Sequence, residues 1–194
     1  MLGQMPKGKI FLSVGTLEPR KNFAQTLKAF DLLWSQNIQV SWVLVGREGW
    51  TGQPDSERQD ILSLIESLQS HPEKGKRLFW MNDAHDDQLA QLYAHADCLL
   101  NASLGEGLGL PLLEAARHGL PLLLTDLPVF KEVAGQNATY FSAHSAAALA
   151  CAIENWIGLS DTQRLDFKNI QTITWTESAF QVLKYLGLQE PWVN

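Results

Sequence analysis

Two glutamates eight positions apart flank the most distinctive turn of this 194-residue chain. Glu106 and Glu114 enclose the run Gly-Leu-Gly-Leu-Pro-Leu-Leu. Residues 97–103 predict a buried strand and residues 112–118 predict a helix, with Pro111 close to the first helical position, where a missing N–H is tolerated. The N–H groups at the start of a helix have no partner within it and can bind an anion. The turn therefore predicts an anion site bordered by two carboxylates.

Carboxylates beside an anion site indicate a ligand that carries hydroxyls as well as phosphate. Ionised carboxylates only accept hydrogen bonds, so a hydroxyl suits them and a phosphate does not. A sugar nucleotide offers both, with a diphosphate in the middle and hydroxyls at each end. Because Glu106 adjoins the predicted phosphate-binding amides, we expect its carboxylate to turn toward a neutral hydroxyl. The alternative for Glu114 is an exposed glutamate on a helix with no ligand.

A second anion site is predicted between the first expected strand and the first expected helix. Asn22 is a plausible N-cap, and Gln25 follows at the spacing of a capping box. Arg20 and Lys21 then lie just outside the positive end of the helix, which is unfavourable unless an anion comes between. A diphosphate would be that anion. The alternative is a pair of solvated surface cations.

Short apolar runs alternate with helical patterns along the chain. Strands are expected at residues 9–15, 40–46, 77–82, 98–103, 121–125 and 139–142. Helices are expected at residues 24–35, 56–69, 112–118, 145–157 and 176–186. This alternation predicts an α/β fold, a Rossmann-like, doubly wound parallel sheet of about six strands with helices on both faces. Ligands of such sheets bind at the carboxyl ends of the strands.

Five segments, in order, resemble the retaining glycosyltransferases of family 4, whose complete members have the two-domain GT-B fold. The segment Glu106–Glu114 resembles their E-x7-E motif, and Val14–Asn22 resembles their early phosphate-binding loop. Residues 44–50 resemble the end of the family's second strand. Residues 87–97 resemble the helix before its motif strand, and residues 127–135 resemble the helix after its fifth strand. The resemblance runs from about residue 9 to about residue 187. It implies the C-terminal, donor-binding domain of such an enzyme, without the N-terminal acceptor domain.

The resemblance also implies a role for each residue of the site. Glu106 binds hydroxyls of the transferred sugar, while Lys21 and Arg20 offset charge on the leaving diphosphate. These three are the predicted catalytic residues, and Glu114 is expected to bind the nucleotide ribose. The remaining predicted donor-binding residues are Gly15, Thr16, Arg47, Met81, Asn82, Gly107, Leu108, Gly109 and Leu110.

The chain departs from the family pattern at two positions. Thr16 stands where the family often has an arginine, a role that Arg20 takes in a recognisable subset, and Leu108 replaces a usual phenylalanine. Two further residues near the predicted base site have two interpretations. Arg47 is either a ligand of the phosphates or base, or a surface cation. Trp80 either lies in the base site or is a core aromatic.

Composition narrows the classes of partner. The net charge is −6, so nucleic acid is not an expected partner. No apolar run approaches the ~20 residues that span a bilayer. Cys98 and Cys151 are in apolar contexts and are expected to be buried, reduced thiols of a cytoplasmic protein. The histidines lack the spacing of a metal site, so no metal is expected.

The implied reaction moves a hexose from a nucleoside diphosphate sugar to a hydroxyl, with retention at the anomeric carbon and no cofactor. GDP-mannose is the first expected donor, because Gly15–Asn22 and Asp126–Glu132 resemble the mannosyltransferase branch. We expect one domain over 1–194, inactive alone, with membrane contact only through the absent domain or a lipid-linked acceptor at the inner membrane face. The alternatives are a non-catalytic module that binds nucleotide sugars and a sugar-nucleotide epimerase of the same fold.

Overall fold

A computed structural model of the chain describes residues 8–142, 145–160 and 175–187, except for the side chains of Glu57 and Trp175. Six parallel strands form one sheet in the order β3-β2-β1-β4-β5-β6. The strands are β1 Lys9–Val14, β2 Val40–Val45, β3 Leu78–Met81, β4 Cys98–Asn101, β5 Leu122–Thr125 and β6 Thr139–Phe141. The α-helices are α1 Phe23–Ser35, α2 Gln59–Ser70, α3 Asp86–His95, α4 Leu110–Arg117, α5 Pro128–Ala134, α6 Ala146–Gly158 and α7 Trp175–Tyr185, and short 3-10 turns cover η1 Pro19–Lys21 and η2 Asp55–Glu57. The predicted parallel α/β sheet is confirmed, and every strand except β5 ends slightly earlier than its apolar run suggests.

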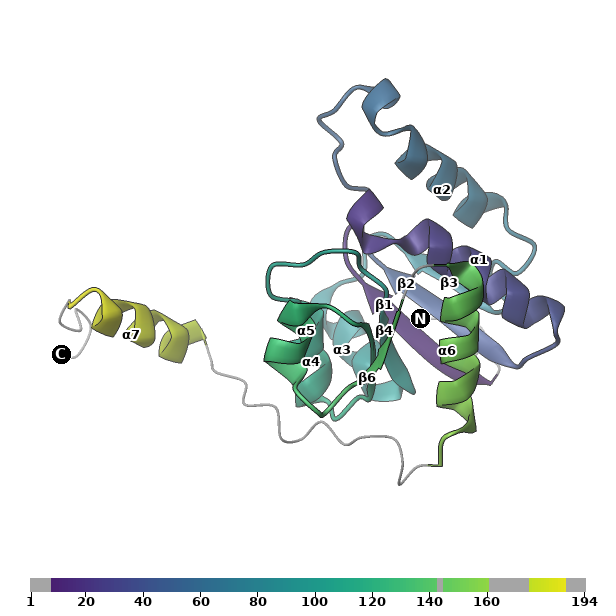
Figure 1. Cartoon of the computed structure of the whole chain (residues 1–194). Helices are drawn as coiled ribbons and strands as arrows, with labels where there is room; N and C mark the ends of the chain where they lie inside the picture. The colour runs from purple at the N-terminus through teal and green to yellow at the C-terminus, as the bar shows by residue number, and fades with distance from the viewer. Residues whose placement is uncertain (1–7, 143–144, 161–174, 188–194) are drawn as a thin grey trace.

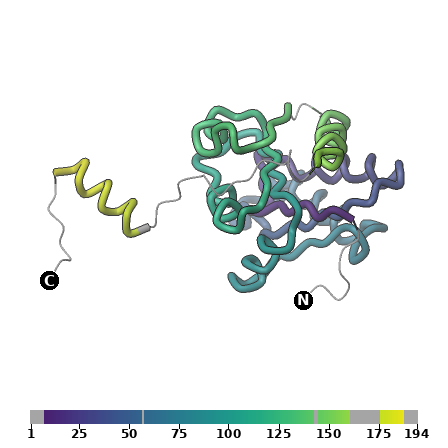
Figure 2. Tube along the Cα trace, turned by 90° about the horizontal axis from the view of Figure 1, so that it is seen from below, coloured from purple at the N-terminus to yellow at the C-terminus, as the bar shows by residue number. Residues whose placement is uncertain are grey.

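Helices cover both faces of the sheet (Figure 1). On one face, α1, α2 and α6 bury an apolar layer that contains stacked rings of Phe30 and Trp42, with centroids 5.5 Å apart. Phe11 of β1 meets Trp156 of α6 edge to face at 5.2 Å. Figure 2 shows α6 beside α1, although β2 to β6 all lie between them in the sequence. The opposite layer packs α3, α4 and α5 around Leu112 and other buried aliphatic side chains.

The strand order places β1 and β4 side by side at the centre of the sheet. Phe11 pairs with Cys98 and Leu12 pairs with Leu99. From β1 the chain proceeds to β2 and β3 on one side, whereas from β4 it proceeds to β5 and β6 on the other. The chain therefore leaves β1 and β4 toward opposite edges of the sheet, and doubly wound sheets bind their ligands at the carboxyl ends of the strands beside such a switch point.

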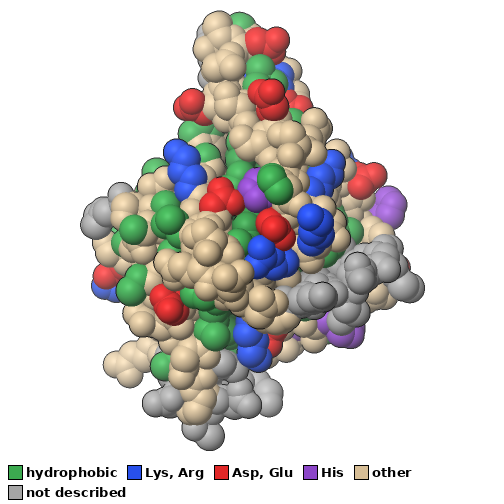
Figure 3. Space-filling model, turned by 90° about the vertical axis from the view of Figure 1, so that its right-hand side faces the viewer, with side chains coloured by type: hydrophobic (Ala, Val, Ile, Leu, Met, Phe, Trp, Pro, Cys, Tyr) green, Lys and Arg blue, Asp and Glu red, His purple; other side chains and the backbone are tan. Residues whose placement is uncertain are grey.

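The remaining surface features bear on partners. Helix α7 is drawn apart from the sheet in Figures 1 and 2, and its described side chains are all at least partly exposed. Within the described ranges, no helix is long and apolar enough to cross a membrane. On the face drawn in Figure 3, acidic and basic side chains are interspersed, so that face has no continuous basic field. Cys98 is buried as expected, but Cys151 is exposed, because it lies on the outer side of α6.

Candidate functional site

The loops after β1 and β4 are hydrogen-bonded to each other across the switch point. The N–H of Leu104 donates to the carbonyl of Arg20 at 2.7 Å, and the Arg20 guanidinium donates to the carbonyl of Gly105 at 3.2 Å. Two segments far apart in the sequence thus form one structural unit at the carboxyl edge of the sheet.

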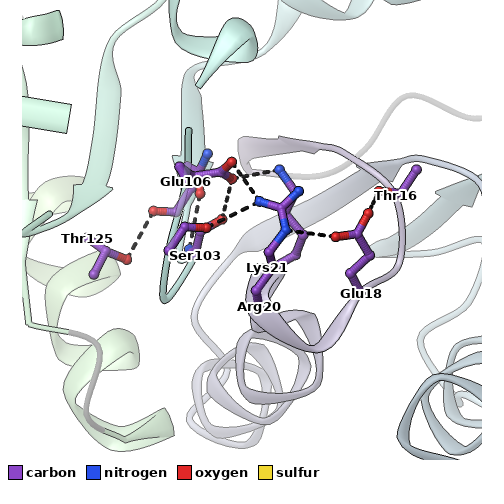
Figure 4. A network of polar contacts seen from close by, with 9 residues as sticks. Thr16, Glu18, Arg20, Lys21, Ser103, Glu106 and Thr125 are labelled. Carbon is purple, nitrogen blue, oxygen red and sulfur yellow. Dashed lines mark hydrogen bonds and ion pairs between the residues drawn. The ribbon is translucent and has the colours of Figure 1, made fainter. Parts of the chain in front are cut away.

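Glu106 is the centre of a charged cluster in this unit (Figure 4). Its Oε1 accepts hydrogen bonds from Lys21 Nζ at 2.6 Å and from Ser103 Oγ at 2.8 Å, and its Oε2 accepts from Arg20 Nη1 at 2.8 Å. The side chains of Lys21 and Glu106 are 9% and 6% exposed, whereas that of Arg20 is 46% exposed. Lys21 and Glu106 therefore form a buried ion pair, and Arg20 closes it from the solvent side.

This cluster differs from the expected arrangement in one respect. An anion does lie between Lys21 and Arg20, but it is the carboxylate of Glu106. This carboxylate therefore binds the two cations instead of facing a site for a hydroxyl. The physical reason is charge balance. Two cations held close together, one of them buried, need a counter-charge, and the loop after β4 brings one within reach.

The pKa of Glu106 reflects these neighbours. Burial raises the pKa of a carboxyl group, but the hydrogen bonds from Lys21, Ser103 and Arg20 and the charge of Lys21 outweigh burial and lower the pKa of Glu106. A carboxyl whose pKa is lower in the folded state than in the unfolded state stabilises the fold above its unfolded pKa. That contribution is lost as the pH falls through the lowered folded value.

We therefore expect the free energy of unfolding to fall on acidification below about pH 4, and to fall less steeply in Glu106→Gln. Urea unfolding measured across this pH range tests the difference. Glu154→Gln is the matched control, since Glu154 is exposed on α6 away from the cluster. Identical pH slopes in Glu106→Gln and the unsubstituted chain would contradict the ion-pair account.

Asn22 does not act as the expected N-cap. It stands directly before α1, but its backbone is left-handed, with φ 61°, and its side chain makes no capping hydrogen bond. The 3-10 turn over Pro19–Lys21 ends there, and a left-handed residue is needed to turn the chain into α1, a conformation that asparagine tolerates. The turn, not a capping box, places Lys21 beside Glu106.

The start of α4 offers the predicted backbone donors. Among the described residues, no hydrogen-bond acceptor is found for the N–H groups of Gly107, Leu108, Gly109 and Leu110. Gly109 is left-handed, with φ 80°, and Pro111 occupies the first turn of the helix. Unpaired amides at a helix start attract an anion. This end of α4 lies in the same loop as Glu106.

Gly109 is the position in this loop where a side chain is most clearly disfavoured. A Cβ there would lie 3.0 Å from Phe130 Cε1 and 3.3 Å from Leu112 Cδ1, in a backbone conformation unfavourable for other residues. Gly109→Ala should lower the free energy of unfolding by roughly 1–3 kcal/mol. Gly107→Ala is the matched control, because a Cβ at Gly107 meets nothing within 4 Å. Urea unfolding of both variants measures the difference in their free energies of unfolding. Equal stability of the two variants would contradict strain at position 109.

Glu114 lies away from the charged cluster, on the face of α4 toward α3. Its Oε2 accepts a hydrogen bond of 2.7 Å from the hydroxyl of Tyr93, and the carboxylate is partly exposed. No cation lies within ion-pair distance of it among the described residues. Glu106 and Glu114 therefore differ in electrostatics, because only the charge of Glu106 is neutralised.

The other expected residues lie around this edge. Gly15 runs against the side chain of Lys21, with Lys21 Cε 3.1 Å from the position of a Gly15 Cβ, and the Thr16 hydroxyl donates to Glu18. Arg47, Met81 and Asn82 follow or end β2 and β3, where the side chains of Arg47 and Asn82 are exposed. Their roles toward a ligand stay predictions.

Trp80 has a structural function. It is half-buried, packs against the core, and its indole N–H donates to the carbonyl of Gly46 at 2.9 Å. The bond ties the end of β3 to the end of β2.

The sequence analysis does not predict two residues of the site. Ser103 belonged to an expected strand and Tyr93 to an expected helix, and neither type is unusual there. Ser103 could have been noticed as a polar residue at the carboxyl end of a central strand. Nothing in the sequence signalled the bond between Tyr93 and Glu114.

No group of three or more His, Cys, Asp or Glu side chains in the described ranges is placed to hold a metal ion. The charged cluster instead combines two cations, one carboxylate and the free amides of α4. Such a set suits a polyanion that also carries hydroxyls.

The profile of one protein family, described as glycosyl transferases group 1, matches residues 2–170. The chain belongs to this family. It is 41% identical over 192 residues to the serotype-specific mannosyltransferase WbdA of Escherichia coli, an alignment that covers 98% of the chain and 22% of that protein. It is 28% identical over 173 residues to the O-antigen chain mannosyltransferase RfbU of Salmonella typhimurium, covering 85% of the chain and 45% of that protein. The chain thus spans less than half the length of these group 1 relatives.

Solved structures agree with the fold. The α,α-trehalose-phosphate synthase (UDP-forming) of Burkholderia vietnamiensis matches with a TM-score of 0.73 at 14% identity, over 92% of the chain and 44% of that protein. The sucrose-phosphate synthase of Thermosynechococcus elongatus matches with a TM-score of 0.71 at 22% identity, over 96% of the chain and 46% of that protein. Membership of glycosyl transferases group 1 and the Rossmann-like half of a GT-B fold are confirmed.

Proposed function

We propose that this chain is the donor-binding half of a retaining mannosyltransferase that uses a nucleoside diphosphate sugar, GDP-mannose in the first instance. The observation that carries the proposal is the cluster of Lys21, Arg20 and Glu106 beside the free amides of α4, at the switch point of the sheet. The names of the relatives, which are mannosyltransferases, support the sugar.

In the proposed reaction, the bond between the anomeric carbon and the diphosphate oxygen breaks, and its electron pair stays on that oxygen. The acceptor hydroxyl oxygen bonds to the same carbon and its proton leaves to solvent. Lys21, Arg20 and the α4 amides stabilise the negative charge that develops on the diphosphate. When the diphosphate takes these cations, Glu106 is released to accept hydrogen bonds from the sugar. These donors supply the charge stabilisation that a metal would otherwise give, so we propose that no metal is required.

The proposal extends to the setting of the whole protein. An acceptor domain outside this chain would hold the hydroxyl substrate, so the chain alone binds the donor but transfers no sugar, since positioning of the acceptor supplies a large part of rate acceleration. A cytoplasmic location, with membrane contact through that domain or a lipid-linked acceptor, is part of the same proposal.

A thermal-shift panel of GDP, UDP, ADP and their sugar derivatives tests the function, because a ligand stabilises the folded chain by RT ln(1 + [L]/Kd). We expect the largest shift with GDP-mannose, and the same shifts with EDTA present. A larger shift with UDP-sugars would change the donor, and no shift with any nucleotide would overturn the donor-binding function. Sugar transfer by this chain alone would contradict the need for an acceptor domain, whereas interconversion of sugar nucleotides would favour the epimerase.

A further inference from the structure

Tyr93 is a buried hydroxyl that the proposed reaction does not use. It lies on α3, is 3% exposed, and its ring stacks on that of His118 at the end of α4, with centroids 5.6 Å apart and planes 13° apart. Its hydroxyl donates to Glu114 Oε2 at 2.7 Å. The ring is thus held by packing, and the hydroxyl is directed at one oxygen of one carboxylate.

Glu114 has a second oxygen without such a partner. Within the described ranges, the hydroxyl of Tyr93 is the hydrogen-bond donor to the carboxylate, and it binds Oε2 alone. Burial and the hydrogen bond to Glu114 raise the pKa of Tyr93, so the phenol stays protonated and remains the donor. Because that donor is neutral, it restrains the Glu114 side chain without placing a positive charge beside the carboxylate. Oε1 is left to accept from a ligand.

We infer that Tyr93 is a positioning residue, which holds Glu114 in the orientation that presents Oε1 to the ribose diol of the donor nucleotide. The inference rests on the proposed function, because it assigns the ligand of Glu114. A free glutamate side chain would lose rotamer freedom when it binds a ligand. A glutamate already held by Tyr93 loses less, which favours binding of the ribose.

The test compares GDP with 2′,3′-dideoxy-GDP, which lacks both ribose hydroxyls, by calorimetry on the full 194-residue chain. Tyr93→Phe removes the hydroxyl and keeps the ring that stacks on His118. We expect Tyr93→Phe to weaken the binding of GDP by roughly three- to tenfold and to leave the binding of dideoxy-GDP unchanged. The expected effect is smaller than that of losing a whole hydrogen bond to a charged group. Should the nucleotide panel identify UDP, the uridine pair replaces the guanosine pair.

Two further variants separate the possible outcomes. Tyr140→Phe is the matched control, because the Tyr140 hydroxyl donates to the carbonyls of Phe130 and Gly135 away from α3, and we expect no change with either ligand. Glu114→Gln should weaken GDP at least as much as Tyr93→Phe. In the Glu114→Gln background, Tyr93→Phe should have little further effect, because the two residues act as one unit.

Each other result has a defined meaning. If Tyr93→Phe weakens both ligands equally, Tyr93 only supports the fold and the inference is wrong, while the proposed function stands. The same holds if Glu114→Gln lowers GDP binding selectively and Tyr93→Phe does not. If the unsubstituted chain does not distinguish GDP from dideoxy-GDP, or binds neither, the assignment of the ribose to Glu114 fails and the inference fails with it.

Discussion

Replacing Lys21 by methionine is expected to weaken the binding of GDP by roughly 10- to 100-fold, because one charge-assisted hydrogen bond to the diphosphate is lost. The binding of guanosine should be nearly unchanged. Lys21 is the more buried of the two cations in the cluster, and its Nζ already holds an anion, the carboxylate of Glu106, at 2.6 Å. Methionine retains the apolar stem that packs beside Gly15. Calorimetry with GDP, GMP and guanosine measures the effect.

Lys28→Met is the matched control, since Lys28 is exposed on α1 and outside the cluster. Loss of the Lys21 charge leaves the Glu106 carboxylate with Arg20 and Ser103, so thermal unfolding of the free variant must show that it remains folded. Equal weakening of GDP, GMP and guanosine would show that Lys21 is not a phosphate ligand. A loss confined to the nucleotides with two phosphates would place Lys21 at the distal phosphate.

Glu106→Gln should have the opposite effect on the free diphosphate. The residue pattern alone predicts unchanged GDP binding, because it places Glu106 toward the sugar. In the structure, the carboxylate occupies both cations, so a diphosphate must displace it. Glutamine keeps the shape and removes the charge. We therefore expect GDP to bind about tenfold more tightly, while the extra affinity of GDP-mannose over GDP decreases.

Glu18→Gln is the graded control for this experiment. Glu18 pairs with Arg20 at 2.8 Å but not with Lys21, so its removal should strengthen GDP binding less than Glu106→Gln does. Calorimetry with GDP and GDP-mannose on both variants gives the comparison. Unchanged or weaker GDP binding in Glu106→Gln would rule out competition between the carboxylate and the diphosphate. An unchanged ratio of GDP-mannose to GDP would remove Glu106 from the sugar.

The elements of the fold could be predicted from sequence because their signals are local. Short, mostly apolar runs such as 40–45 are typical of strands covered on both faces, and the intervening patterns have a helical period. Boundaries were less accurate. Asn82 follows β3 without belonging to it, because Met81 pairs with Val45, the last residue of the neighbouring strand β2.

The composition of the site was also readable in part. Glycines, a proline and two glutamates in a strand-to-helix turn indicate a helix start that binds an anion, and Gly109 and Pro111 adopt the expected positions. The cap of α1 could not be predicted correctly from the sequence. Asn22 fits the pattern of a capping residue, but a preceding 3-10 turn requires it to be left-handed, and its side chain then cannot reach the first turn of α1.

Contacts between side chains that are far apart in the sequence could not be predicted. Lys21 and Glu106 meet because β1 and β4 are neighbours in the sheet, and Tyr93 meets Glu114 because α3 and α4 pack on the same face. Neither adjacency is encoded in a local pattern. Residue types and spacing thus indicated that this edge of the sheet could bind a charged, hydroxyl-bearing ligand. Which carboxylate pairs with cations and which does not depends on distances that arise only when distant segments pack together.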